Sequence, residues 1–303
     1  MINIFKYLRK ILFIGFFLIF FSFSLLVFFL WKFSPDLPSY DELKNYNPNL
    51  TSRVFTSDGL ILDKYYVEER IFVPIDRVPK SLINAFISAE DKNFFNHIGI
   101  DFIAILRASI TNIMHKFSNR RMIGASTITQ QVVKNLLLSN EISLERKFKE
   151  MILAIRIENI LSKEQILELY LNDIYLGFGS YGVATAGMNY FNKSLNELSL
   201  TEVAFLASLP KAPNNYNPIT KYSNAIERRN WVLNKMYKNN FITSEEMLLK
   251  NEPIKVVNRY EDKFKEANYF KEEVRKQLYN LLGKDALYKE GLIIKTSINT
   301  DLQ

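Results

Sequence analysis

The chain has 303 residues, enough for a large hydrophobic core and one or two domains. It contains no cysteine and only two histidines, His97 and His115. This composition excludes disulfides, thiolate zinc sites and a cysteine nucleophile, and it disfavours a histidine-rich metal site or a Ser-His-Asp triad. The formal net charge of +7 predicts an anionic partner such as phospholipid headgroups, a phosphate or a nucleic acid.

Residues 11–31 carry no charged side chain and follow a basic segment, residues 1–10. At about 1.5 Å per residue, an apolar helix of this length spans roughly 31 Å, close to the hydrocarbon core of a bilayer. A cleaved signal peptide, with Ser22 and Ser24 near the cut, is the alternative, but its apolar core would be only about 7–15 residues long. We therefore predict a cytoplasmic tail, a retained transmembrane anchor and a chain outside the cytoplasmic membrane. That topology favours anionic lipid as a partner and disfavours nucleic acid.

The composition and pattern of residues 32–80 predict a stalk followed by a short β hairpin. The stalk is rich in Pro, Asn and Asp, and a Ser-Asp-Gly turn at residues 57–59 separates two runs of β-favouring residues. From residue 81 to about residue 250 the apolar spacing is helical. Residues 251–303 return to a mixed pattern, with a strand-like segment near the end, and we interpret them as a linker.

Local signals predict where several of these helices begin. Ser162 with Gln165, Ser199 with Glu202, and Thr243 with Glu246 have the spacing of a capping box, and Asp101 is expected to cap the helix that follows it. The segment "LGFGSYGVATAG" contains four glycines, where close approach of two backbones is expected.

The stretch "AEDKNFFNHIGID", residues 89–101, ends an apolar helix on two adjacent carboxylates and continues with aromatic residues. Such a carboxylate is either a solvated helix end or a catalytic acid or base whose pKa is set by partial burial. On the second interpretation, Glu90 faces a cleft and Phe94 and Phe95 form its wall.

The stretch "GASTITQQVVKN" places Ser126, Gln130 and Lys134 on one face if a helix begins near Ser126. Ser126 and Thr127 would then lie at the helix N-terminus, where free N–H groups favour anions. Hydroxyl, amide and ammonium groups at that place suit a phosphate or pyrophosphate joined to a sugar. An ordinary capped polar face is the alternative.

Three further motifs are weaker. Arg146 and Glu150 have i, i+4 spacing, which also fits a surface ion pair worth a few tenths of a kcal/mol. Glu164 and Glu168 share a helical face. Ser208 begins an S-x-x-K match, but Pro210 disfavours helical geometry there and no K-T-G partner follows, so we do not expect an acyl-enzyme nucleophile.

Taken in order, "EDKNFFNHIGID", "GASTITQQVVKN", "RKFKEMILAIRIE", "ILELYLNDIYLGFGSYGV", "LASLPKAPNNYNP" and "RRNWVLNKM" resemble the peptidoglycan glycosyltransferase domain (glycosyltransferase family 51) of class A penicillin-binding proteins. The resemblance implies a mainly α-helical, lysozyme-like fold over residues 81–250 with minor β structure at the edges. It implies polymerisation of lipid II, with a lipid-linked glycan as donor and undecaprenyl pyrophosphate as leaving group. Membrane phospholipid and other cell-wall synthesis proteins are the implied partners, at the inner membrane with the catalytic domain on its outer face.

The resemblance also implies roles for individual residues. Glu90 matches the general base that deprotonates the acceptor 4-hydroxyl, and Glu150 matches a second important glutamate. No cofactor is required, although a divalent cation such as Mg²⁺ assists the pyrophosphate in some members. The substrate-binding positions carried over by the resemblance are Arg107, Ser126, Thr127, Gln130, Gln131, Lys134, Arg146 and Glu164.

Some features depart from the family pattern. Ala125 replaces a common second glycine, and Ile142 replaces a common cation, for which Lys147 or Lys149 would have to substitute.

Residues 116–121 are interpreted as a flap over the donor. The sequence shows no penicillin-binding transpeptidase domain, so no transpeptidase activity is expected from it. A lysozyme-like glycan hydrolase and a non-catalytic, membrane-anchored lipid II binding module are the alternatives.

Overall fold

The structure is a computed structural model that describes residues 48–116, 124–139, 141, 143–257 and 264–299, with scattered residues between 9 and 37. Most of the predicted anchor and the predicted flap, as well as Ile142, lie outside the described residues. Among the residues that are described, no helix combines the length and the apolar character needed to cross a bilayer.

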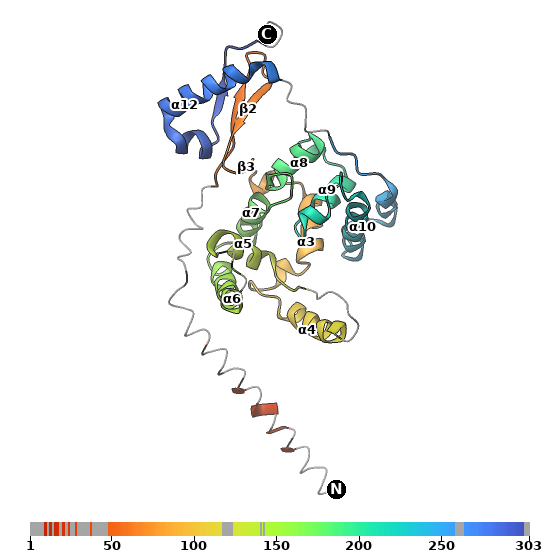
Figure 1. The fold of residues 1–303 in the computed structure, drawn as a ribbon. Helices are drawn as coiled ribbons and strands as arrows, with labels where there is room; N and C mark the ends of the chain where they lie inside the picture. The colour runs from red at the N-terminus through yellow and green to blue at the C-terminus, as the bar shows by residue number, and fades with distance from the viewer. Residues whose placement is uncertain are drawn as a thin grey trace.

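The described part of the chain is mainly α-helical with little β structure, as the sequence predicts (Figure 1). The helices are α3 Lys80–Glu90, α4 Phe102–Lys116, α5 Ile128–Leu137, α6 Leu144–Glu158, α7 Lys163–Asp173, α8 Val183–Phe191, α9 Leu200–Leu206, α10 Tyr222–Lys238, α11 Ser244–Met247 and α12 Asn268–Lys289. The strands are β1 Ser52–Phe55, β2 Ile61–Tyr65, β3 Glu69–Arg70, β4 Ser180–Tyr181 and β5 Ile293–Lys295.

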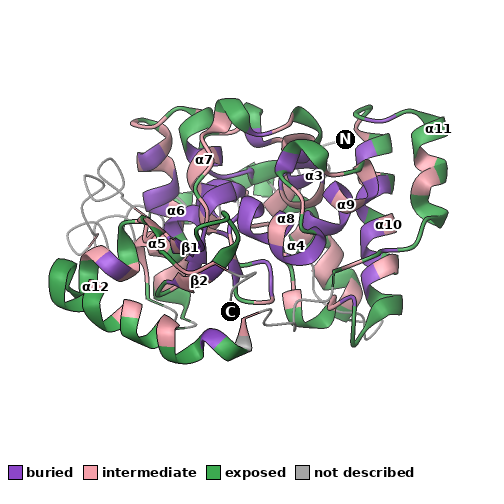
Figure 2. Ribbon diagram, turned by 90° about the horizontal axis from the view of Figure 1, so that it is seen from above, coloured by how far each residue is buried: buried purple, intermediate pink, exposed green. Residues whose placement is uncertain are grey.

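A large apolar core lies among α3, α5, α7, α8, α9 and α10, where Figure 2 shows the buried residues concentrated. Phe86 of α3 and Tyr170 of α7 meet edge to face in this core, with ring centroids 6.2 Å apart. Phe205 of α9 and Leu233 of α10 are fully buried in the same cluster. Each such side chain contributes about 1.5–3 kcal/mol through burial, so the core holds the ends of α3 and α5 in fixed positions.

The predicted helix starts are confirmed where the signal is local. Ser162, Ser199 and Thr243 are N-caps with complete capping boxes. Asp101 Oδ1 accepts the backbone N–H of Ala104 at 2.8 Å, so it caps α4 as expected. Caps of this kind satisfy N–H groups that have no partner within the helix.

Two of the predicted glycines are closely packed, Gly182 against backbone, as expected, and Gly177 against a side chain. A Cβ on Gly182, whose φ is +79°, would lie 2.7 Å from the carbonyl oxygen of Asn172. A Cβ on Gly177 would lie 2.7 Å from the Tyr190 hydroxyl. The loop between α7 and α8 therefore packs against both helices at distances that no side chain would allow.

A second, smaller core lies beside the predicted hairpin. Strands β1 and β2 pair antiparallel, and β5 adds to β1 in parallel, which gives the order β2-β1-β5. One face of this sheet packs under α12 through Val54, Tyr65 and Leu287. Part of the range interpreted as a linker therefore forms a helix and a strand that close the apolar face of the hairpin.

Candidate active site

Glu90 is the last residue of α3 and lies at a cavity of about 450 Å³. Four segments distant in the sequence meet there: the end of α3, one side of α4, the loop before α5, and α10. The predicted residues Glu90, Arg107, Ser126 and Thr127 all line this cavity. It therefore combines a carboxylate, a cation and two hydroxyl groups around one space.

The surroundings of Glu90 favour its protonated form more than water does. Burial raises the pKa of Glu90 above its usual value of 4.5. A 2.9 Å hydrogen bond from Gln131 Nε2 and the positive charges of Arg228 and Lys211 oppose this rise, while the adjacent Asp91 adds to it. A carboxylate with a raised pKa holds a proton more strongly, which suits a general base.

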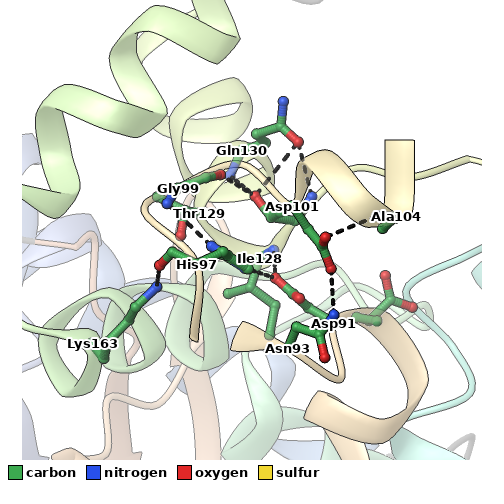
Figure 3. Close-up of polar contacts among 12 residues, drawn as sticks. Asp91, Asn93, His97, Gly99, Asp101, Ala104, Ile128, Thr129, Gln130 and Lys163 are labelled. Carbon is green, nitrogen blue, oxygen red and sulfur yellow. Dashed lines mark hydrogen bonds and ion pairs between the residues drawn. The ribbon is translucent and has the colours of Figure 1, made fainter. Parts of the chain in front are cut away.

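Asp91 is adjacent to Glu90, and one oxygen of its carboxylate, Oδ2, holds neighbouring segments in place. Its Oδ2 accepts the backbone N–H of Ile128 at 3.0 Å and lies 2.8 Å from His97 Nε2 (Figure 3). Because the Gly99 N–H donates to His97 Nδ1, we assign the neutral ring proton to Nε2, which donates to Asp91. A negative charge at the N-terminus of α5 is favourable. Asp91 and His97 thus fix the start of α5 next to Glu90.

Other residues of the segment 89–101 help to hold the chain between α3 and α4. Asn93 donates to Asp101 Oδ2 at 2.6 Å. The prediction that Phe94 and Phe95 form the wall of the cleft is wrong. Phe94 is buried in the core, with the Lys163 ammonium over its ring, and Phe95 is exposed. Neither ring lines the cavity, whose aromatic residue is Trp231 of α10.

The N-terminus of α5 differs from the open face that the spacing predicts. Thr127 is the N-cap, and its Oγ1 accepts the Gln130 N–H and donates to the Gly99 carbonyl at 2.6 Å. The Gln130 side chain turns back to accept the Thr127 N–H and is only 1% exposed. Ser126 therefore precedes the helix, Gln130 serves the cap, and Lys134 is exposed further along α5.

Glu150 lies in an ion-pair cluster on α6. It is 2% exposed, and it pairs with Lys147 and with Arg146 Nη1, the latter at 3.4 Å. Lys147 Nζ also donates to Ser126 Oγ at 2.8 Å, which joins the cluster to the cavity lining. The alternative of a solvated surface pair does not fit a buried carboxylate with two cationic partners.

Other predicted residues lie apart from the cavity. Glu164 is exposed on the first turn of α7, whereas Glu168 accepts the Ile75 N–H at 2.7 Å. Ser208 is fully buried and its hydroxyl donates to the Phe205 carbonyl at 2.7 Å. That geometry agrees with the expectation that Ser208 is not a nucleophile.

Sequence reasoning missed the contribution of α10. Trp231, Lys235 and Lys238 line the cavity, and the Arg228 guanidinium lies 3.8 Å from the centre of the Trp231 ring. Burial lowers the pKa of Lys235, and the nearby cations Lys238, Lys92, Arg107 and Arg228 lower it further. Residues 228, 231, 235 and 238 recur at helical spacing in "RRNWVLNKMYK", residues 228–238, a signal that could have identified this basic face.

Comparison with known proteins adds an independent finding. A family model described as a transglycosylase matches residues 58–237. Penicillin-binding protein 1A of Rickettsia typhi is 46% identical over 282 residues, covering 92% of this chain and 36% of that protein. Penicillin-binding protein 1A of Aquifex aeolicus is 44% identical over 279 residues, covering 92% and 38%. The crystal structure of Haemophilus influenzae penicillin-binding protein 1A aligns with a TM-score of 0.49 at 28% identity, covering 84% and 28%. The chain spans little more than a third of the length of the curated relatives it matches.

Proposed function

Since the chain belongs to the transglycosylase family, we propose that it is a peptidoglycan glycosyltransferase that polymerises lipid II into β-1,4 glycan strands. The reaction inverts the donor anomeric carbon and releases undecaprenyl pyrophosphate. The observation that carries the proposal is Glu90, a carboxylate with a raised pKa at a cavity whose lining also holds Arg107, Lys235 and Lys238.

In the proposed reaction, Glu90 accepts the proton of the acceptor sugar 4-hydroxyl as that oxygen attacks C1 of the donor. The bond from C1 to the pyrophosphate oxygen breaks, and the leaving group departs with the electron pair. An alcohol is a poor nucleophile until a base within hydrogen-bond reach takes its proton. Burial raises the pKa of Glu90, so its carboxylate is a stronger proton acceptor than a solvated one.

The departing pyrophosphate needs fixed positive charge nearby. We propose that Arg107 and the lysines of α10 supply it at the cavity, and that Glu150 holds Lys147 against Ser126. Lys134, exposed on α5, remains a proposed donor-site cation. Within the described ranges, no group of three or more His, Asp or Glu side chains is arranged to hold a metal ion, so we derive no step through the divalent cation.

A lipid-linked substrate requires the site to lie at a membrane, and α4 fits that requirement. None of its residues is buried, and Phe102, Ile103, Leu106, Ile110 and Ile113 are each more than half exposed along one side of the helix. An apolar stripe of this kind favours contact with lipid chains. We therefore propose membrane phospholipid as a partner and an inner-membrane location with the site on the outer face.

Incubation of the purified chain with lipid II tests the proposal. We expect lipid-linked polymer and free undecaprenyl pyrophosphate. Cleavage of preformed glycan without polymerisation would instead support a hydrolase, and lipid II binding without turnover would support a binding module. Glu90→Gln, prepared identically, serves as the inactive control.

A further inference from the structure

A second cavity, of about 300 Å³, lies between the hairpin and α8 and plays no part in the proposed reaction. Its apolar lining comes from Ile61, Ile71, Val73, Ala184, Met188 and Leu195. Ligand sites are typically cavities of about 300–1,000 Å³, mainly apolar with a few placed polar groups, and they favour the junction of two packed bodies. This cavity has that composition and that location.

Positively charged side chains outnumber carboxylates at this cavity. Arg53, Lys64 and Arg77 line it with one carboxylate, Glu69. Glu69 is 2% exposed, and it already pairs with Lys64 and accepts a hydrogen bond from Asn189. Within the part of the chain that the structure describes, neither the Arg53 nor the Arg77 side chain has an ion-pair partner. Among the described residues, two guanidinium groups without an ion-pair partner therefore line an apolar cavity.

The strand register places two cations where their repulsion lowers the stability of the fold. Arg53 lies directly opposite Lys64 in the antiparallel pair, so both side chains leave the same face of the hairpin. Like charges in directly opposed positions are destabilising. Val54 and Tyr65 occupy the other face, against α12, so the register cannot shift by one residue without exposing that core. An anion at the cavity would relieve the repulsion.

We propose that this cavity binds a small ligand that joins an anionic head, a carboxylate or a phosphate, to an apolar group. Arg53 and Arg77 bind the head, because a planar guanidinium matches both kinds of oxygen anion. The apolar group lies between Val73 of the chain after β3 and Met188 of α8. Figure 1 shows β2 and α8 well away from α4, so the ligand comes from the aqueous side rather than from the membrane. Binding at this cavity does not depend on the proposed glycosyltransferase activity, and only the aqueous origin of the ligand rests on the proposed membrane contact of α4.

Because the chain has no cysteine, a single thiol can report on the cavity. Asn196→Cys, at the exposed rim, carries an environment-sensitive fluorophore, and Ser244→Cys, exposed at the start of α11, carries the same label as a control. The full-length protein is titrated with 4-phenylbutanoate, with 3-phenylpropyl phosphate and with the uncharged 4-phenylbutanamide. We expect a response at position 196 only, with at least one anion bound tenfold or more tightly than the amide. The tighter anion identifies the head group.

Three substitutions locate the bound anion. Arg53→Gln and Arg77→Gln should each raise its dissociation constant about tenfold, as expected for loss of a charge-assisted hydrogen bond. Met188→Trp should fill the apolar part and weaken both anion and amide. Lys276→Gln, an exposed cation of α12, should change nothing. The proposal would be overturned by any of three results. These are equal binding of acid and amide, binding that survives both arginine substitutions, and no response to either anion in folded protein.

Discussion

The cavity wall around Glu90 and the ion-pair cluster around Glu150 place two glutamates in different electrostatic surroundings. Glu90 receives a neutral hydrogen bond from Gln131, and burial raises its pKa. Glu150 is held by two cations, Arg146 and Lys147. Glu150 therefore lies between two cationic groups, whereas Glu90 lies at the cavity with a neutral hydrogen-bond donor. The difference supports the proposed roles, which are proton transfer for Glu90 and the fixed placement of cations for Glu150.

The largest expected effect is that of Glu90→Gln. Removing a general base typically lowers the rate about 10²–10⁴-fold, or by roughly 3–5 kcal/mol of barrier. Because the folded-state pKa of Glu90 is raised, its deprotonation costs stability as the pH rises from about 4.5 through that pKa. The neutral amide removes this cost, so the melting temperature at pH 7 should be unchanged or higher. Single-turnover polymerisation and thermal unfolding measure the two effects.

Glu227→Gln, an exposed glutamate of α10, is the matched control and should retain wild-type turnover. Polymerisation by Glu90→Gln within a few-fold of wild type would mean that another group is the base, with Glu150 the next candidate.

Glu150→Gln should lower turnover less, about 10- to 100-fold, and it should also destabilise the fold. The substitution leaves Arg146 and Lys147 without their anion. Breaking a buried pair costs about 3–5 kcal/mol, and the partial exposure of Lys147 reduces this to about 1–3 kcal/mol. Denaturant unfolding beside steady-state kinetics checks both parts. A loss of activity with full stability would place Glu150 in the chemical step and remove the contrast with Glu90.

Lys147→Met tests the link between the two regions. It removes the hydrogen bond to Ser126 and one partner of Glu150, so the KM for lipid II should rise about three- to tenfold while kcat changes less. Lys149→Met is the control, because Lys149 pairs with the exposed Glu145 instead. Equal effects of the two substitutions would show that only the net charge of α6 matters.

The smallest expected effect is a pH shift from Gln131→Leu. The Gln131 hydrogen bond lowers the pKa of Glu90, so its loss should raise that pKa further. The base works in its deprotonated form, and the acidic limb of the kcat/KM profile should therefore move to higher pH. Gln277→Leu, at an exposed position of α12, should leave the profile unchanged. A limb that does not move would mean that it reports a different group.

Features set by near neighbours in the chain were predictable from the sequence. The caps at Ser162 and Asp101 and the hairpin turn at Gly59 depend on residues within a few positions. The inward turn of Gln130 could also have been expected, since Thr127 and Gln130 have capping-box spacing, but the choice between the cap and a ligand depends on the tertiary surroundings.

Features set by distant segments were not predictable in this way. The basic wall of α10 reaches Glu90 across some 140 residues of sequence, and only the packed core determines that meeting. The same holds for Phe94, because nothing local distinguishes an aromatic side chain that lines a cavity from one that enters the core. Helix α12 lacks a strong amphipathic pattern, and a kink at Gly283 interrupts it.

The parallel pairing of β1 with β5 has a consequence for the order in which the protein is made. Ser52 Oγ accepts the backbone N–H of Leu292, 240 residues later in the chain. At a synthesis rate of about 5–20 residues per second, the hairpin waits roughly 10–50 s on the ribosome for its third strand and for α12. During that interval Val54, Leu62 and Tyr65 have no partner layer, although the helices of the main core have already been synthesised. Nascent chains arrested before residue 268 should therefore expose this hairpin face to chaperones, and chains released after residue 299 should bury it.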